Sequence, residues 1–322
     1  MNEDKKPFDK RELSAILIMA SLFVIIHGIS ILITGTFQDE GMQAFEDPDN
    51  PLNIIYILFI MLIFTALILL IAKFWKKQLI QIIILGAIGY TSTYVFYPIF
   101  NLILHDSYNI YIPVNESSQI VISSSIIISI FLAFILIITL YKYPEWYIID
   151  IAGIIIGAGA ITIFGISLGI LLVIILLICL SIYDAISVYK TKHMIDLADT
   201  VMDLKLPVLL VVPKIRNYSL IRETKRLKEQ LDEKSERDAF FMGLGDVVMP
   251  GILVVSVFNN LSNPLPIALS VIIGTLIGFV FLMNYVIKGK PQAGLPFLCG
   301  GAILGFIISS LIFFGELKGL IF

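Results

Sequence analysis

Apolar runs of spanning length recur nine times along the 322 residues of this chain, with polar segments between them. A helix needs about 20 apolar residues to cross a bilayer, because each residue rises about 1.5 Å and the hydrocarbon core is about 30 Å thick. The sequence therefore predicts an all-α membrane protein with nine transmembrane helices. We expect them at Leu13–Thr36, Leu52–Ala72, Leu79–Phe100, Gln119–Tyr141, Trp146–Phe164, Ile166–Val188, Ala239–Leu261, Pro264–Ile287 and Leu295–Leu317.

Composition and charge agree with this class and indicate an orientation. Hydrophobic residues make up 58% of the chain and charged residues only 15%, which is too apolar for a soluble domain. Of the 22 Lys and Arg residues, all but Lys318 precede the first run or lie in alternate connections between runs. Because cytoplasmic loops retain basic residues, we expect the N-terminus in the cytoplasm and the C-terminus outside. Compact loops and the lack of a targeting signal favour a prokaryotic plasma membrane.

One long polar stretch, 189–238, divides the chain into a six-span part (1–188) and a three-span part (239–322). Within it, 221–237 is dense in alternating charges, which favours a solvated helix or a linker. Leu206–Pro213 is a short β-branched run that could form an interfacial strand or plug, or could pack against the membrane face. The unequal division does not suggest the equal halves of an inverted-repeat transporter.

Three acidic residues fall within the predicted spans, where a carboxylate costs about 2.5–3.5 kcal/mol on insertion scales. Asp150 lies four residues after Trp146, so we expect an interfacial side chain that reaches lipid headgroups. Asp184 and Asp246 lie about four and seven residues inside the cytoplasmic ends of the sixth and seventh runs, which have opposite directions. The two carboxyls therefore share a depth and can meet if these helices are neighbours.

Two carboxyls held close together suit one kind of chemistry. Both cannot ionise cheaply, so one keeps its proton while the other can take a proton from water. This division between acid and base is what an aspartyl protease requires, without a metal or a covalent nucleophile. Cys179 and Cys299 fall in spans and no metal-type Cys or His spacing occurs, so we expect no metal and no cofactor.

The residues beside each aspartate fit the same chemistry. Tyr183 stands directly before Asp184, and Gly243-Leu244-Gly245 stands directly before Asp246. Glycine there permits close approach of helices or local unwinding that admits a substrate backbone. This ordered pair of motifs resembles the presenilin and signal peptide peptidase family of GxGD intramembrane aspartyl proteases. The resemblance spans most of the chain and is strongest to prokaryotic presenilin homologues.

The resemblance implies a third motif, Pro-Ala-Leu, at the start of the ninth span and beside the aspartates. The matching positions read Ala293-Gly294-Leu295-Pro296, which keep the leucine and the following proline but lack the leading proline. The basic loop between the aspartate spans agrees with presenilins, since signal peptide peptidases have the inverted arrangement. Presenilins also cut themselves in that loop, so the resemblance makes Leu206–Pro213 a candidate plug or self-cleavage site.

The sequence thus predicts a protease that cuts within transmembrane segments of single-span membrane proteins, with Asp184 and Asp246 as its catalytic residues. A helical substrate must unwind first, and a strand edge near Val208–Val212 or Gly243 could pair with it. The expected partners are such substrates and the lipid bilayer, with a homo-oligomer also compatible and nucleic acid not indicated.

Two alternatives stay open. A signal-peptide-type or prepilin-type peptidase would use the same chemistry on other substrates. An ion or solute pathway would instead use Asp184 and Asp246 as proton-relay carboxylates in a water-filled cavity.

Overall fold

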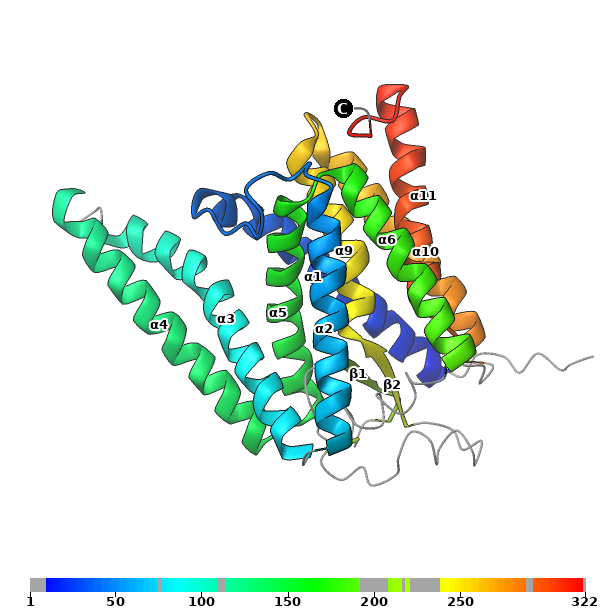
Figure 1. Cartoon of the computed structure of the whole chain (residues 1–322), viewed down its shortest axis with the longest axis horizontal. Coiled ribbons are helices and arrows are strands. Elements are labelled where there is room, and N and C mark those ends of the chain that lie inside the picture. Colours follow the sequence, from blue (N-terminus) through cyan, green and yellow to red (C-terminus); the bar gives the residue numbers. More distant parts are fainter. Residues whose placement is uncertain are drawn as a thin grey trace, which may run out of the picture.

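The computed structural model describes residues 10–74, 77–108, 114–191, 208–215, 218–220, 238–287 and 292–320. In these ranges the chain forms nine α-helices and one two-stranded antiparallel sheet (Figure 1). The helices are α1 (Lys10–Asp39), α2 (Leu52–Phe74), α3 (Lys77–Tyr108), α4 (Val114–Lys142), α5 (Trp146–Ser167), α6 (Ile170–Ile186), α9 (Leu244–Asn260), α10 (Pro264–Val286) and α11 (Leu295–Phe314). A π-helical turn, Ser187–Thr191, continues α6, and the strands are β1 (Leu209–Pro213) and β2 (Ala239–Gly243).

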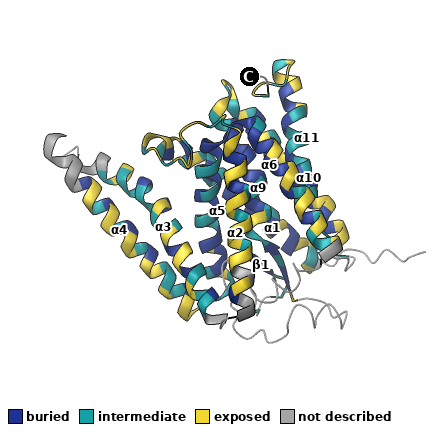
Figure 2. Cartoon of the chain, in the orientation of Figure 1, coloured by how far each residue is buried: buried dark blue, intermediate teal, exposed yellow. Residues whose placement is uncertain are grey.

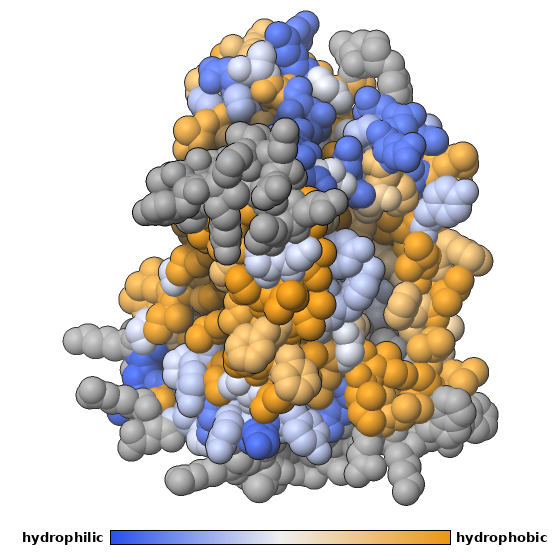
Figure 3. Space-filling model, turned by 90° about the vertical axis from the view of Figure 1, so that its left-hand side faces the viewer, coloured by the Kyte–Doolittle hydropathy of each residue, from blue (hydrophilic) through white to orange (hydrophobic). Residues whose placement is uncertain are grey.

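Each helix coincides with one of the predicted apolar runs. Seven of the described helices are long and apolar enough to cross a membrane, while α9 and the described part of α2 are shorter apolar helices. Many large apolar residues are exposed, and Leu32 and Ile312 are 81% and 72% exposed. Exposed positions occur along the helices at the outside of the bundle (Figure 2). Apolar side chains cover most of the middle of one face, with hydrophilic ones gathered toward its two ends (Figure 3). The chain is therefore an integral multi-pass membrane protein.

Helix α9 lies at the centre of the bundle. It packs against α1, α5, α6, α10 and α11, whereas α3 and α4 form a pair at one edge (Figure 1). Residues on every side of α9 are fully buried, including Leu253, Val254 and Val255. Burial on every side means that neighbouring helices, rather than lipid, surround α9. The residues at the start of α9 are therefore surrounded by several helices.

Glycines bring α10 and α11 into very close contact. A Cβ atom on Gly274 would lie 2.2 Å from the carbonyl oxygen of Gly301, and one on Gly305 would lie 2.4 Å from that of Ser270. Small residues four apart let helix backbones approach in this way inside a membrane. The close crossing fixes where α11 begins.

The sheet corrects one predicted span. Ala239–Gly243 was expected to be the first part of the seventh helix, but it pairs with β1 in the register Leu209↔Gly243 to Pro213↔Ala239. A short apolar run does not by itself distinguish a strand from a buried helix, and here the partner strand decides. Asp246 therefore lies in the first turn of α9, not seven residues into a helix.

The sheet also shows which of the predicted structures the Leu206–Pro213 segment adopts. Leu206–Pro213 forms a strand from Leu209 onward, while Leu206 itself lies outside the described residues, as does the charged segment 221–237. The strands lie at the end of the bundle opposite the C-terminus (Figure 1). A bond from the Lys214 ammonium to the Glu12 carboxylate, 3.4 Å long, places the start of α1 at that end too.

Replacing Gly301 by valine should separate α10 from α11, because its Cβ would meet the Gly274 carbonyl oxygen at 2.2 Å. We expect a destabilisation of roughly 2–3 kcal/mol, measured as a lower thermal midpoint in detergent. Gly300→Val is the matched control, since nothing lies within 4 Å of a Cβ there. Equal midpoints for the two variants would contradict this account of the crossing.

Candidate active site

Asp184 lies near the end of α6 and is 3% exposed. Its Oδ2 accepts the backbone N–H of Leu295 at 3.1 Å. Leu295 is the first residue of α11, and the first amides of a helix have no partner within the helix. The carboxylate thus receives a donor that the α11 start leaves unused. The Ser181 hydroxyl, one turn earlier on α6, donates to the Leu295 carbonyl at 3.4 Å and joins the same two helices.

Asp246 is the third residue of α9, and Gly243 is the helix N-cap. The Asp246 carboxylate turns back toward Gly243. An acidic residue at the third position of a helix commonly reaches back in this way to the N-cap amide. A Cβ on Gly243 would lie only 3.3 Å from Oδ2 of Asp246, so the glycine leaves room for this carboxylate. The Gly-x-Gly-Asp spacing is therefore the local geometry of a helix start.

Two consecutive residues at the start of α11 lie next to the two aspartates. Leu295 donates to Asp184, while a Cβ on the preceding Gly294 would lie 3.0 Å from Oδ2 of Asp246. Consecutive residues at the start of α11 thus contact acids from two different helices, α6 and α9. Asp184 and Asp246 therefore lie in one site, at the end of the bundle that carries the strands.

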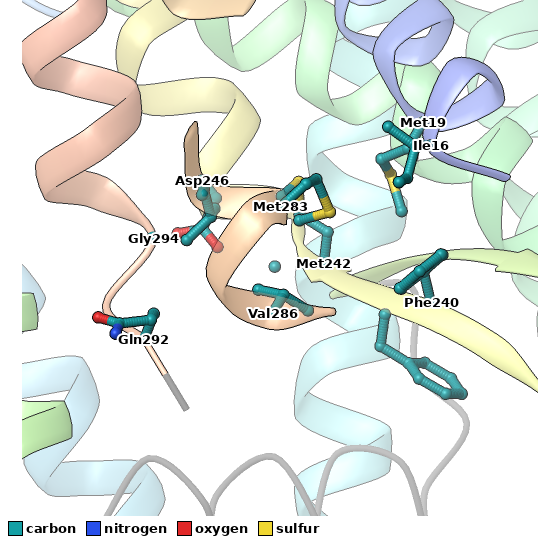
Figure 4. Close-up of a pocket in the computed structure, with 12 residues that line it drawn as sticks. Ile16, Met19, Phe240, Met242, Asp246, Met283, Val286, Gln292 and Gly294 are labelled. Atoms are coloured by element: carbon teal, nitrogen blue, oxygen red, sulfur yellow. The ribbon is translucent and has the colours of Figure 1, made fainter. Parts of the chain in front are cut away.

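A pocket of about 120 Å³ opens beside Asp246 (Figure 4). Asp246 and Gly294 lie together at one end of it, with Met283 and Met242 next to them and Phe240 farther away. This volume has room for several water molecules. Its walls are largely apolar, with polar groups concentrated at the aspartate.

The other predicted site residues do not all lie beside the two aspartates. Tyr183 is 51% exposed on the outer face of α6, so it does not share the buried position of its neighbour. Leu244 packs on α5, where its Cδ1 would lie 3.2 Å from a Cβ on Gly157. Gly245 is exposed, with open space around its Cα. In the third motif, Ala293 is buried before the α11 start and Pro296 occupies its first turn.

Asp150 contradicts the expectation of a headgroup-facing side chain. It lies in α5 with only 7% exposure, and its Oδ1 accepts the Val211 backbone N–H at 2.8 Å. Strand β1 packs against α5 at this point, and Gly153 leaves space for Leu210, whose Cδ2 would lie 3.0 Å from a Cβ there. A position near a helix end indicates access to the interface only when no other segment covers it.

Some side chains near the site are not among the site residues predicted from the sequence. Ser181 stands three residues before Asp184, a spacing that places both on one helix face and could have identified it. His27 of α1 donates its Nε2–H to the Val247 carbonyl at 3.0 Å and so supports α9 directly after Asp246. The Tyr189 hydroxyl bonds to Gln292, at the edge of the pocket. No local pattern marks Gln292.

The helical bundle with two paired aspartates defines the class of intramembrane aspartyl proteases, and comparisons with known proteins agree. Residues 20–315 match the family model described as signal-peptide peptidase, presenilin aspartyl protease. The chain therefore belongs to the signal peptide peptidase and presenilin family of aspartyl proteases. No curated protein matches it.

Two solved structures of a presenilin family intramembrane aspartate protease are similar to the chain. The one in space group P2 is 33% identical with a TM-score of 0.64, and covers 92% of this chain and 97% of its own. The one in space group C222 is 31% identical with a TM-score of 0.59, and covers 91% of this chain and 95% of its own. The likeness thus extends over nearly the whole length of both chains.

Enlarging Gly294 should impair the site in proportion to the size of the new side chain. For Gly294→Ala, the added Cβ meets only the end of the Asp246 side chain, which can move by a few tenths of an ångström. Gly294→Val should displace the carboxylate further and lower kcat on the order of 10²-fold, as misplacement by about 1 Å does elsewhere. Initial cleavage rates of a labelled single-span substrate would measure both effects.

Gly300→Val serves as the control for Gly294→Val, because it adds the same side chain to α11 away from the carboxyls. The role given to Gly294 is contradicted if Gly294→Val keeps the wild-type kcat, or if Gly300→Val lowers kcat by the same factor.

Proposed function

We propose that this chain hydrolyses peptide bonds within transmembrane segments of single-span membrane proteins, with Asp184 and Asp246 as the catalytic residues. The observation that carries the proposal is the α11 start, where Leu295 bonds to Asp184 and Gly294 adjoins Asp246. Asp184 is buried and Asp246 half-buried, and two such acids from separate helices are costly in a membrane unless their meeting has a use. Membership of an aspartyl protease family supports that use.

The proposed mechanism divides the work between the two carboxyls. The ionised one takes a proton from a water molecule, whose oxygen bonds to the carbonyl carbon of the scissile peptide. The protonated one donates to the carbonyl oxygen, and a proton then passes to the departing amine as the C–N bond breaks. Because a close pair titrates as a unit, the roles of Asp184 and Asp246 are interchangeable in this scheme.

Water for the reaction is available from the pocket beside Asp246. The pocket has room for several water molecules and lies at the end of the bundle where the strands are. Orientation by the basic residues would make this the cytoplasmic end, with the C-terminus outside. The site would then act near the cytoplasmic side of a substrate whose N-terminus lies outside, in the presenilin manner.

An unwound substrate needs partners for its backbone, because a helix that opens in a membrane exposes amides and carbonyls that water cannot satisfy. Strand β2 ends at Gly243, three residues before Asp246, and Phe240 to Gly243 line the pocket. Addition of an extended segment to the edge of β2 would bring a peptide bond to the carboxyls. The division into 1–188, 189–238 and 239–322 fits this scheme, with one aspartate in each membrane part.

Replacing either aspartate by alanine should reduce cleavage of a labelled single-span substrate by roughly 10²- to 10⁴-fold, because one half of the acid–base pair is lost. The purified Asp184→Ala and Asp246→Ala proteins should remain folded by circular dichroism. Substantial cleavage by a folded variant would contradict the assignment. Aspartate-dependent ion flux in vesicles without cleavage would instead favour the pathway alternative.

The cleavage rate should have a bell-shaped dependence on pH. Below the optimum both carboxyls carry protons and no base remains, while above it both are ionised and no acid remains. Initial rates across the acidic and neutral range, with folding checked at each pH, would measure the profile. A rate that only rises with pH would argue against a shared proton.

A further inference from the structure

The hydrogen-bond pattern of the sheet shows which backbone groups face away from it. Lys214 donates to the Asp238 carbonyl and Leu244 donates to the Val208 carbonyl, each at 2.8 Å. In an antiparallel pair, bonded positions alternate with positions whose groups point outward. With the observed register, Val211 and Pro213 of β1 and Phe241 of β2 therefore point their backbone groups away from the partner strand.

The outer edge of β1 is closed. Proline has no N–H to offer at Pro213. The Val211 N–H is already bonded to Asp150 at 2.8 Å. Helix α5, which carries Asp150, packs along this strand, and β1 residues Leu210, Val211 and Val212 are all buried. A second strand therefore has no place on this side.

The outer edge of β2 has the opposite surroundings. Phe240, Phe241, Met242 and Gly243 all line the pocket beside Asp246, and no residue of β1 does. The sheet thus has one edge fixed to α5 and one edge that borders the candidate active site. Gly243 at the end of β2 is the N-cap of α9, so this end of the edge is fixed beside Asp246, while β1 and α5 hold the part of β2 toward Ala239.

Helix α5 holds the β1 segment at two points. Asp150 bonds to Val211, and Glu145, directly before α5, accepts both the Ser219 hydroxyl at 2.6 Å and the Leu220 N–H at 3.1 Å. Of these bonds, only the Asp150 bond acts within the strand itself. Without it, the strand pair could pivot about its fixed end at Gly243, and an extended substrate on the loosened β2 edge could slip by two residues without changing which of its side chains face the core.

We propose that Asp150 is a positioning residue that holds the strand pair against α5 and thereby sets the register of an extended substrate on the β2 edge, which decides where the substrate is cut. This inference rests on the proposed function, since it concerns how an extended substrate on the β2 edge is aligned with the aspartates. The carboxylate of Asp150 does not touch the substrate. It acts through Val211 and β1, and β1 in turn positions β2.

The test measures where a single-span substrate is cut, by mass spectrometry of the products, together with kcat and KM. Asp150→Leu removes the acceptor and should spread the products over positions two residues apart. The same change should raise KM by about tenfold, the worth of one buried hydrogen bond, with kcat less affected. Asp150→Asn keeps an acceptor oxygen and should retain the wild-type distribution of products.

Two further variants separate register from stability. Val211→Pro removes the donor at an outward-facing position, where proline does not disturb the ladder, and should spread the products as Asp150→Leu does. The double variant should spread them no further, because both changes remove one bond. Thr162→Val removes another buried bond of α5, to the Ser30 carbonyl at 3.2 Å, and should leave the products unchanged.

A measurement on the wild-type protein covers the case in which Asp150→Leu does not fold. Hydrogen exchange should find the Val211 amide as protected as those of Leu210 and Val212, whose positions bond across to β2. Fast exchange at Val211 overturns the inference, as does an unchanged product distribution in Asp150→Leu or a spread one in Asp150→Asn. Loss of the proposed function is distinguishable, because wild-type protein would then cut nothing.

Discussion

The need to satisfy buried carboxyls with backbone donors organises this structure. A carboxylate in the hydrocarbon core loses its water, and each missing partner there costs several kcal/mol. Asp184 receives the Leu295 amide at the start of α11, and the Asp246 carboxylate adjoins Gly243 at the start of α9. Helix starts are suitable donors because their first amides are unpaired and carry partial positive charge. Two helix starts must therefore meet at one level of the membrane.

That meeting depends on close helix packing elsewhere. The start of α11 reaches the aspartates because glycines let α10 and α11 approach almost backbone to backbone, as at Gly274 and Gly301. The start of α9 is enclosed by five other helices, which hold it at the centre of the bundle. Small residues far from the carboxyls thus determine whether the carboxyls meet. The rigidity of the site follows from packing along the whole length of α10 and α11.

The sheet solves a second problem of backbone satisfaction at the same end of the molecule. Strands with open edges do not occur in lipid, since their amides would lack partners. Here β1 bonds to β2 on one side and to Asp150 on the other. The edge of β2, in contrast, borders the pocket next to Asp246. Asp150, an acid outside the proposed catalytic pair, thus bonds to the strand whose partner borders the pocket.

The sequence by itself determined the number and approximate extents of the helices and singled out the two aspartates. The free energy of placing an apolar run or a charged group in a membrane is large and depends on the local sequence alone. It also predicted that the last helix begins at Leu295. Only the tertiary structure decided that Ala239–Gly243 is a strand, that Tyr183 faces outward and that Asp150 bonds to Val211. Each of these depends on a partner distant in sequence, 61 residues away for Asp150. Such partners leave no periodic pattern in the local sequence, so only the folded chain shows them.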